Sequence, residues 1–120
     1  MKTHKDLDVW KISIEMVTEI YKLTRNFPKE EIYGLTNQMR RAAVSVPSNI
    51  AEGAGRNSSK EFVQFLNFST GSLSELETQL IIAYNLEYIN NEQKQSMDIL
   101  FTNIFKMLSG LIQSIKKRNT

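Results

Sequence analysis

The sequence predicts an all-α protein, an antiparallel up-down-up-down four-helix bundle with a proline-kinked second helix. Apolar residues recur at intervals of three and four along nearly all of its 120 residues, which is the period of helices that bury one face. The two prolines and five glycines can be assigned to helix ends, a kink or a helix contact, so no strand is needed. The connections between these helical patterns are short, which favours antiparallel neighbours. We expect a single domain, residues 1–120, with helices at about 6–26, 34–53, 58–88 and 91–117.

The helix expected at 6–26 carries two apolar stripes. Asp6 or Asp8 can accept hydrogen bonds from the free amides of its first turn. Phe27-Pro28 ends it, because the residue before a proline disfavours the α region. The first stripe consists of Leu7, Trp10, Ile14, Val17 and Tyr21, and the second of Val9, Ile12, Met16, Ile20 and Leu23. This helix is therefore apolar around much of its circumference.

The helix expected at 34–53 contains Pro47, which removes one backbone hydrogen bond and crowds the carbonyl four residues back. The apolar phase survives the proline, since Val46 and Ile50 stay on the stripe. We therefore predict one kinked helix, in which Ser45, Ser48 or Asn49 satisfies the freed backbone groups. Gly53-Ala54-Gly55 is predicted to end the helix, because glycine reaches left-handed conformations at low cost.

The last two helices each begin with a capping signal. Ser58 and Glu61 have the S-x-x-E spacing of a capping box, and Asn90 with Gln93 forms a second, weaker one. Gly71 lies in a patch of small residues, where a neighbouring helix is expected to approach closely. The expected inward faces are Phe62, Phe65, Leu66, Ser69, Leu73, Leu76, Leu80 and Ala83, and then Met97, Phe101, Ile104, Leu108, Leu111 and Ile115.

Residues for catalysis are scarce, so no enzyme, catalytic residue, cofactor or metal site is predicted. There is no cysteine, and the one histidine, His4, excludes a multi-histidine metal site and leaves a nucleophilic serine without a well-placed base. Glu30-Glu31 and Glu75-Glu77 are one or two residues apart, so their carboxylates do not share a helix face. The stretch GAGRNSSK lacks the spacing of a phosphate-binding loop and follows a helix instead of a strand. Arg40-Arg41 is expected to form a salt bridge, for example with Glu77 or Glu75, with a ligand contact as the alternative.

The N-terminal segment MKTHKDLDVW is charged where a signal peptide needs an apolar run, and no stretch approaches the ~20 apolar residues of a membrane span. We therefore expect a soluble, cytoplasmic protein with no membrane partner.

The net charge is only +2, but an up-down topology gathers positive charge at one end of the bundle. Seven Lys and Arg would meet four Asp and Glu there, an excess of three: Lys2, Lys5, Arg56, Lys60, Lys116, Lys117 and Arg118 against Asp6, Asp8, Glu52 and Glu61. Such a cluster favours the phosphates of RNA or DNA, although lysine-rich termini are also ordinary solvated surface. The predicted contacts are Arg56, Lys60, Lys116, Lys117 and Arg118. The amide end of the third helix beside them is either an anion site or a purely structural cap.

Several apolar residues fall outside the inward faces, which favours a homo-oligomer, although scattered surface apolar residues are also normal. The candidate interface residues are Val63, Phe68, Ile81, Ile82, Ile99 and Phe105.

Three stretches resemble the 23S rRNA intervening-sequence proteins: KDLDVWK (5–11), FPKEEIYGLTNQMRRAAVSVPSNIAEGAGR (27–56) and LSELETQL (73–80). The resemblance reaches about residue 89, and the fourth helix matches only in its helical pattern. It implies a four-helix bundle that often forms a ring-like homopentamer, with no established catalytic residues, and some members are encoded within insertions of bacterial 23S rRNA genes. A more distant similarity to accessory proteins of diversity-generating retroelements implies association with nucleic acid and a reverse transcriptase.

Taken together, these observations favour a non-enzymatic oligomeric bundle that binds RNA or DNA backbone through its basic end. The alternative is a protein–protein scaffold or adaptor that does not bind nucleic acid. No cofactor or small-molecule substrate is expected in either case.

Overall fold

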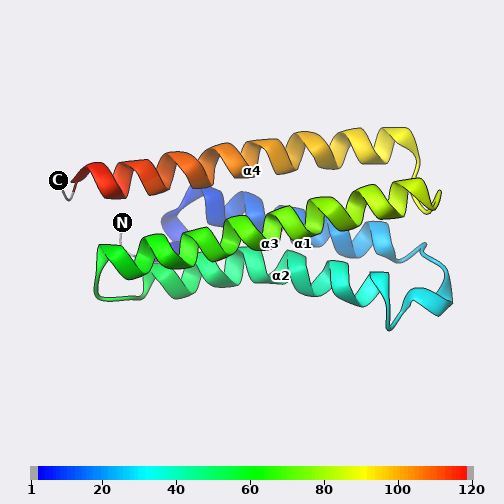
Figure 1. Ribbon diagram of the computed structural model, residues 1–120, viewed down its shortest axis with the longest axis horizontal. Coiled ribbons are helices and arrows are strands. Elements are labelled where there is room, and N and C mark those ends of the chain that lie inside the picture. The colour runs from blue at the N-terminus through cyan, green and yellow to red at the C-terminus, as the bar shows by residue number, and fades with distance from the viewer. Residues whose placement is uncertain (1–2, 119–120) are drawn as a thin grey trace.

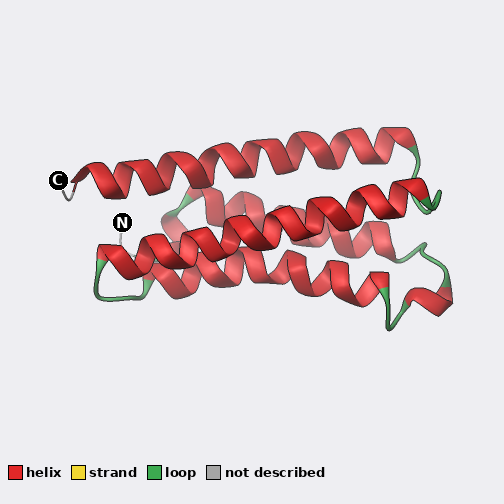
Figure 2. Cartoon of the chain, viewed as in Figure 1, coloured by secondary structure: helices red, strands yellow, loops and turns green. Residues whose placement is uncertain are grey.

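The computed structural model describes residues 3–118, which contain four long helices and no strand (Figures 1 and 2). The long helices are α1 (Asp8–Thr24), α2 (Leu35–Ala54), α3 (Ser59–Asn85) and α4 (Asn91–Arg118), and two short 3-10 helices are η1 (His4–Asp6) and η2 (Lys29–Glu31). They pack as a bundle of 48 × 24 × 20 Å, which confirms the predicted all-α class. In Figure 1 the chain reverses direction between successive helices, so both termini and the α2–α3 connection lie at one end.

The inner face of α1 is the second of its two apolar stripes. Met16 and Ile20 are fully buried, and Val9 nearly so, whereas Ile14 and Tyr21 of the first stripe remain 40% and 38% exposed. One stripe stays partly outside because α1 packs mainly on α2 and only more weakly on α4. The apolar surface of α1 therefore exceeds what its neighbours within the chain cover.

Helix α2 continues through the buried Pro47, and side chains donate hydrogen bonds to carbonyls near the proline. Asn49 Nδ2 donates to the Ser45 carbonyl at 2.8 Å, and Ser69 Oγ donates from α3 to the Val46 carbonyl at 2.8 Å. Neither acceptor is the Ala43 carbonyl, the one that Pro47 leaves without its helical donor, so the predicted contribution of Asn49 stays a prediction, while α3 adds a donor that the sequence pattern did not indicate. The kink itself stays a prediction.

Helix α2 ends at Ala54, within the predicted Gly53-Ala54-Gly55 stretch, but the predicted left-handed glycine conformation is wrong. No glycine in residues 3–118 has a positive φ, and Gly55, at the end of α2, has a φ of −86°. Gly53 is buried within α2, where an added Cβ would lie 2.7 Å from the Cβ of Phe65 on α3. The close helix approach expected at Gly71 therefore occurs at Gly53, and a Cβ on Gly71 would meet nothing within 4 Å.

At the other end of the bundle, Glu31 ties the α1–α2 connection to the α3–α4 connection. Its Oε1 accepts a hydrogen bond from the first amide of α2, that of Leu35, at 3.1 Å, and its Oε2 accepts one from the Tyr88 hydroxyl at 2.7 Å. The Tyr88 bond, and then the Leu35 bond, lowers the pKa of the Glu31 carboxyl, and the same carboxylate raises the pKa of Tyr88.

The predicted caps of α3 and α4 are present to different extents. Asn90 Oδ1 accepts from the Gln93 amide at 2.8 Å and Gln93 Oε1 accepts from the Asn90 amide at 2.9 Å, so this capping box is complete. At the start of α3, the Ser58 hydroxyl accepts from the Glu61 amide at 3.2 Å. Helix α3 ends at Asn85, earlier than expected, because Glu87 adopts a left-handed conformation with a φ of 64°.

Candidate nucleic-acid interface at one end of the bundle

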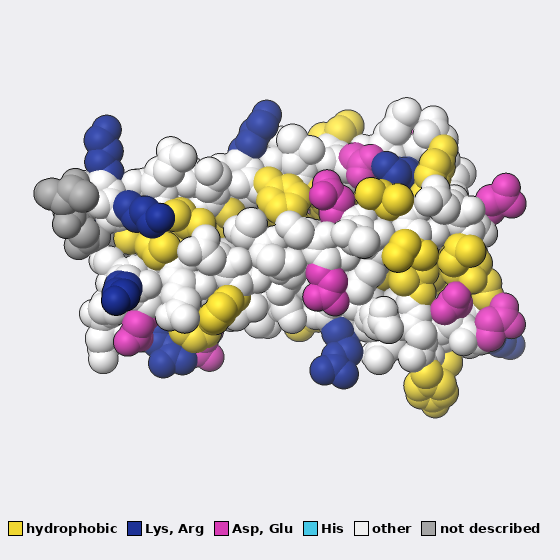
Figure 3. Space-filling model, in the orientation of Figure 1, with side chains coloured by type: hydrophobic (Ala, Val, Ile, Leu, Met, Phe, Trp, Pro, Cys, Tyr) yellow, Lys and Arg dark blue, Asp and Glu magenta, His cyan; other side chains and the backbone are white. Residues whose placement is uncertain are grey.

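The five predicted contact residues belong to two segments that end at the same end of the molecule. Arg56 lies in the α2–α3 connection, Lys60 in the first turn of α3, and Lys116, Lys117 and Arg118 in the last turn of α4. We call this set the basic end. Figure 3 shows Lys and Arg side chains gathering toward the end where the termini lie, and Asp and Glu more frequent at the opposite end. Lys2, which was assigned to the same cluster, lies outside the described residues.

Arg56 already has contacts within the chain. Its Nη2 lies 3.3 Å from Glu52 Oε2, one helical turn back in sequence, and its guanidinium lies 4.7 Å from the centre of the Phe65 ring. The side chain is still 43% exposed, so an incoming phosphate can reach it while competing with Glu52. Arg56 is therefore held in position, but part of its charge is neutralised.

The other basic-end residues are exposed, and their positions have a structural as well as a functional explanation. Lys116, Lys117 and Arg118 occupy the C-terminal turn of α4, where cations are stabilised by the helix dipole. Lys60 follows the Ser58 cap, and this cap satisfies one amide of the α3 N-terminus. The cap itself is thus structural, and what remains available to a ligand is a group of cationic side chains.

The groups that could support catalysis have structural contacts or lie apart. Within residues 3–118, no three His, Cys, Asp or Glu side chains come together as a metal site would require. His4 lies edge-on to Trp10, with ring centres 5.1 Å apart. Glu31 is bonded to Tyr88 and Leu35, and Glu75 accepts a hydrogen bond from Gln79 at 3.2 Å.

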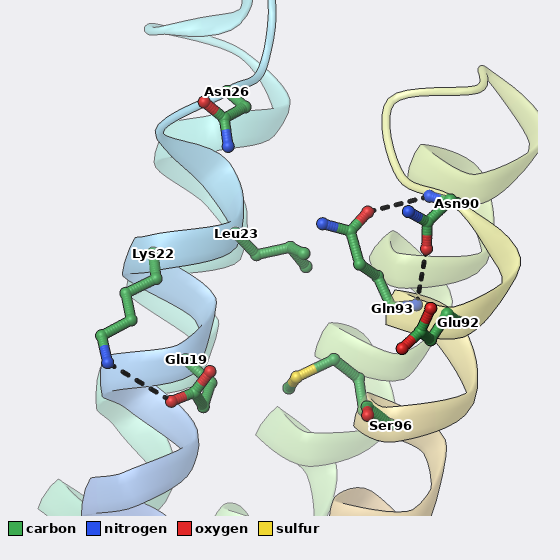
Figure 4. Close-up of a pocket in the computed structure, with 9 residues that line it drawn as sticks. Glu19, Lys22, Leu23, Asn26, Asn90, Glu92, Gln93 and Ser96 are labelled. Carbon is green, nitrogen blue, oxygen red and sulfur yellow. Dashed lines mark hydrogen bonds and ion pairs between the residues drawn. The ribbon is translucent and has the colours of Figure 1, made fainter.

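A hollow of about 440 Å³ lies between α1 and α4, near the end away from the termini (Figure 4). Figure 4 shows Leu23 pointing from α1 toward α4, with Glu92 and Ser96 on the α4 side. Its polar groups are largely paired, since Glu19 lies 3.7 Å from Lys22 and the Asn90–Gln93 cap forms part of the wall. The hollow offers mixed charge and no cluster of like groups.

The structure places the predicted interface residues in different environments. Phe68, Ile81, Ile82 and Ile99 are 49%, 44%, 43% and 66% exposed, and Phe105 is half-buried against the core. Val63 differs, because at 8% exposure it belongs to the chain's own core and has little surface left for a partner. Ile14 and Tyr21, from the first stripe of α1, are also exposed. Sequence patterns missed further exposed apolar residues on α2, in the η2 connection and after α3: Ile32, Tyr33, Val44 and Leu86.

The salt bridge predicted for Arg40-Arg41, for example with Glu77 or Glu75, is also wrong, because neither arginine forms an ion pair within residues 3–118. Arg40 Nε instead donates to Thr24 Oγ1 on α1 at 2.9 Å. The sequence therefore did not indicate that Arg25 and Lys29, which follow α1, lie beside Arg40 and Arg41 of α2. The available signal was the short connection between these helices, which places the end of α1 beside the start of α2.

The fold and its side chains define a helical bundle protein with a charged end, and comparison with known proteins agrees with this class. The family described as 23S rRNA-intervening sequence protein matches residues 5–110, and the chain belongs to that family. The match extends through most of α4, farther than the sequence motifs indicated, and stops before Lys116. None of the helices in residues 3–118 has a stretch long and apolar enough to cross a bilayer.

A solved structure supports the same fold. It is the crystal structure of a protein of unknown function from the S23 ribosomal protein family of Bacteroides thetaiotaomicron, to which this chain is 29% identical. The TM-score is 0.78, and the alignment covers 87% of this chain and 97% of that one. None of the curated proteins matches the chain.

Proposed function

We propose that this protein is a non-enzymatic, oligomeric bundle of the cytoplasm that binds the backbone of RNA or DNA through its basic end. The observation that carries the proposal is the convergence of the α2–α3 connection and the last turn of α4 at one end of the molecule. Lysine and arginine side chains presented together supply the salt-dependent part of polynucleotide binding without reading its sequence.

The experiment is a salt titration of RNA and DNA binding with a tail variant, K116Q/K117Q/R118Q. Its matched control is K11Q/K22Q/K106Q, which removes the same charge from three exposed lysines outside the basic end. We expect the tail variant to lose affinity and to flatten the plot of log K against log salt by about 2 for single strands and about 3 for duplex. The control should keep the wild-type slope.

Two results would reject this site. Equal losses in the tail variant and its control would mean that only the total charge matters. Failure of the wild-type protein to retain either nucleic acid at low salt would reject nucleic-acid binding altogether and favour the scaffold or adaptor function.

Oligomerisation is the second part of the proposal, and a homopentamer is the assembly that the family resemblance implies. It is supported by the exposed apolar residues of α3 and α4, among them Phe68 and Ile99. A closed ring would repeat the basic end around its axis and multiply the phosphate contacts. Analytical ultracentrifugation should show an oligomer that F68D/I99D dissociates and Q64D leaves intact, whereas a monomeric wild-type protein would disprove it.

A further inference from the structure

Two adjoining hollows between α1 and α2 share Arg40 and are lined by four cations and no carboxylate. The larger, of about 530 Å³, is lined by Tyr21, Asn37, Arg40, Arg41, Val44 and Ser45. The smaller, of about 240 Å³, also contains Arg40 and adds Arg25 and Lys29. We call the two together the α1–α2 groove.

None of the four groove cations is neutralised within the part of the chain that the structure describes. The ion pairs there are Lys22–Glu19, Arg56–Glu52 and Lys94–Asp98, so the pairs involve other cations. The groove thus differs from the basic end, where Arg56 is paired. Four like charges along one groove repel one another, and a bound anion would relieve that repulsion.

Arg40 is held in place at the centre of the groove. Its Nε donates to Thr24 Oγ1 at 2.9 Å, and the Thr24 hydroxyl in turn donates to the Ile20 carbonyl at 2.8 Å. The guanidinium lies 4.6 Å from the centre of the Tyr21 ring, and its Nη2 donates to the Tyr21 carbonyl at 3.4 Å. A guanidinium fixed in this way loses little conformational freedom when it binds a ligand.

The shape of the groove favours a chain of phosphates over a single ion. On α2 the lining residues Asn37, Arg40, Arg41, Val44 and Ser45 follow one helix face, which at 1.5 Å per residue extends about 12 Å. Arg25 and Lys29 continue the positive charge beyond Arg40 into the smaller hollow. Successive phosphates of an extended strand can therefore meet successive cations.

The aromatic ring distinguishes a single strand from a duplex. Tyr21 is 38% exposed and stacks with Arg40, and both aromatic rings and arginine planes are surfaces on which unpaired bases stack. We propose that the α1–α2 groove binds a single-stranded polynucleotide, with Arg25, Lys29 and Arg41 on its phosphates and the Arg40–Tyr21 pair against a base. This inference rests on the proposed nucleic-acid binding but uses a surface separate from the basic end.

The test compares a groove variant, R25Q/K29Q/R41Q, with the tail variant and with K11Q/K22Q/K106Q, all of which lose three positive charges. The three groove residues changed are exposed and make no ion pair within residues 3–118, so the fold should persist, which circular dichroism checks. The probes are a fluorescent oligo-uridine of about 15 nucleotides and a duplex of equal length, since single-strand sites span about 4–16 nucleotides.

We expect the groove variant to bind the single strand at least tenfold more weakly, with a salt slope reduced by about 2, and to affect duplex binding less. R40K, which keeps the charge but loses the planar group, should weaken single-strand binding alone. Ultraviolet cross-linking of the wild-type complex should place the oligonucleotide on Tyr21.

Wild-type affinity in the groove variant, together with a loss in the tail variant, would overturn the groove inference and leave the proposed function intact. Absence of binding by the wild-type protein would overturn both. Displacement of the oligonucleotide by poly-glutamate or inorganic phosphate at equal charge concentration would also overturn the groove inference, because it would show that the groove binds anions in general.

Discussion

Replacing Gly53 by alanine should destabilise the protein, although the same change stabilises most helices. The new Cβ would lie 2.7 Å from the Phe65 Cβ and 3.2 Å from the Phe62 carbonyl oxygen, and neither atom is the end of a flexible side chain. To reach an ordinary contact, α2 and α3 must separate by roughly 1 Å, and overpacking of this kind costs about 1–3 kcal/mol. Helix propensity returns about 1 kcal/mol, so we expect a net loss of up to about 2 kcal/mol.

Gly71 and Gly110 provide matched controls. Both lie within helices, both are exposed, and an added Cβ would meet nothing within 4 Å at either position. G71A and G110A should therefore each gain up to about 1 kcal/mol from propensity alone. Urea denaturation with an unchanged m-value measures all three variants, and repeating it at several protein concentrations separates folding from assembly. A G53A protein as stable as G71A would refute the close-approach argument.

Two further predictions concern the end of the bundle away from the termini. E87G should raise the free energy of unfolding by about 1 kcal/mol, because Glu87 has a φ of 64° and glycine adopts this conformation without the steric cost of a Cβ. Chemical denaturation measures this gain, and an unchanged midpoint would contradict the prediction. Y88F should raise the pKa of Glu31, because the largest cause that holds it below 4.5 is the Tyr88 hydrogen bond, and NMR titration of the carboxyl carbon measures this. In the wild-type protein this bond contributes to stability above pH 4.5, and the contribution is lost as the pH falls through the lowered pKa of Glu31. At alkaline pH it is lost as the pH rises through the raised pKa of Tyr88. The free energies of unfolding of wild type and Y88F should therefore converge at both extremes of pH.

The local helix signals were read well from the sequence because they depend on neighbours in the chain. The 4-and-3 spacing of residues such as Met97, Phe101 and Ile104 predicted the buried face of α4, and the Asn90–Gln93 capping box is complete. The predicted ends of helices were less exact where the conformation of a single residue ends the helix. Nothing in the residue type of Glu87 indicates a left-handed φ, so the end of α3 was expected too late.

The candidate sites were predicted less completely than the helices. The basic end followed from chain topology, because the α2–α3 connection and the end of α4 must meet if the helices alternate in direction. The α1–α2 groove did not follow from topology. The sequence suggested a carboxylate on α3 as the partner of Arg40, whereas in the structure Arg40 contacts Thr24 and Tyr21 of α1. The partner of Arg40 depends on how each helix is rotated about its own axis. A broad apolar face allows a range of rotations, so the periodic pattern alone does not decide between the two partners.

The sequence by itself thus determined the helices, their order, their caps and the family, because these depend on spacing and on short-range hydrogen bonds. Only the tertiary structure decided which stripe of α1 faces inward, that Gly53 and not Gly71 lies at the close helix contact, and that Val63 is core. It also brought Arg25, Lys29, Arg40 and Arg41 to one groove. The physical reason is that helix periodicity defines an apolar face, whereas the neighbour that covers it is selected by packing among all four helices.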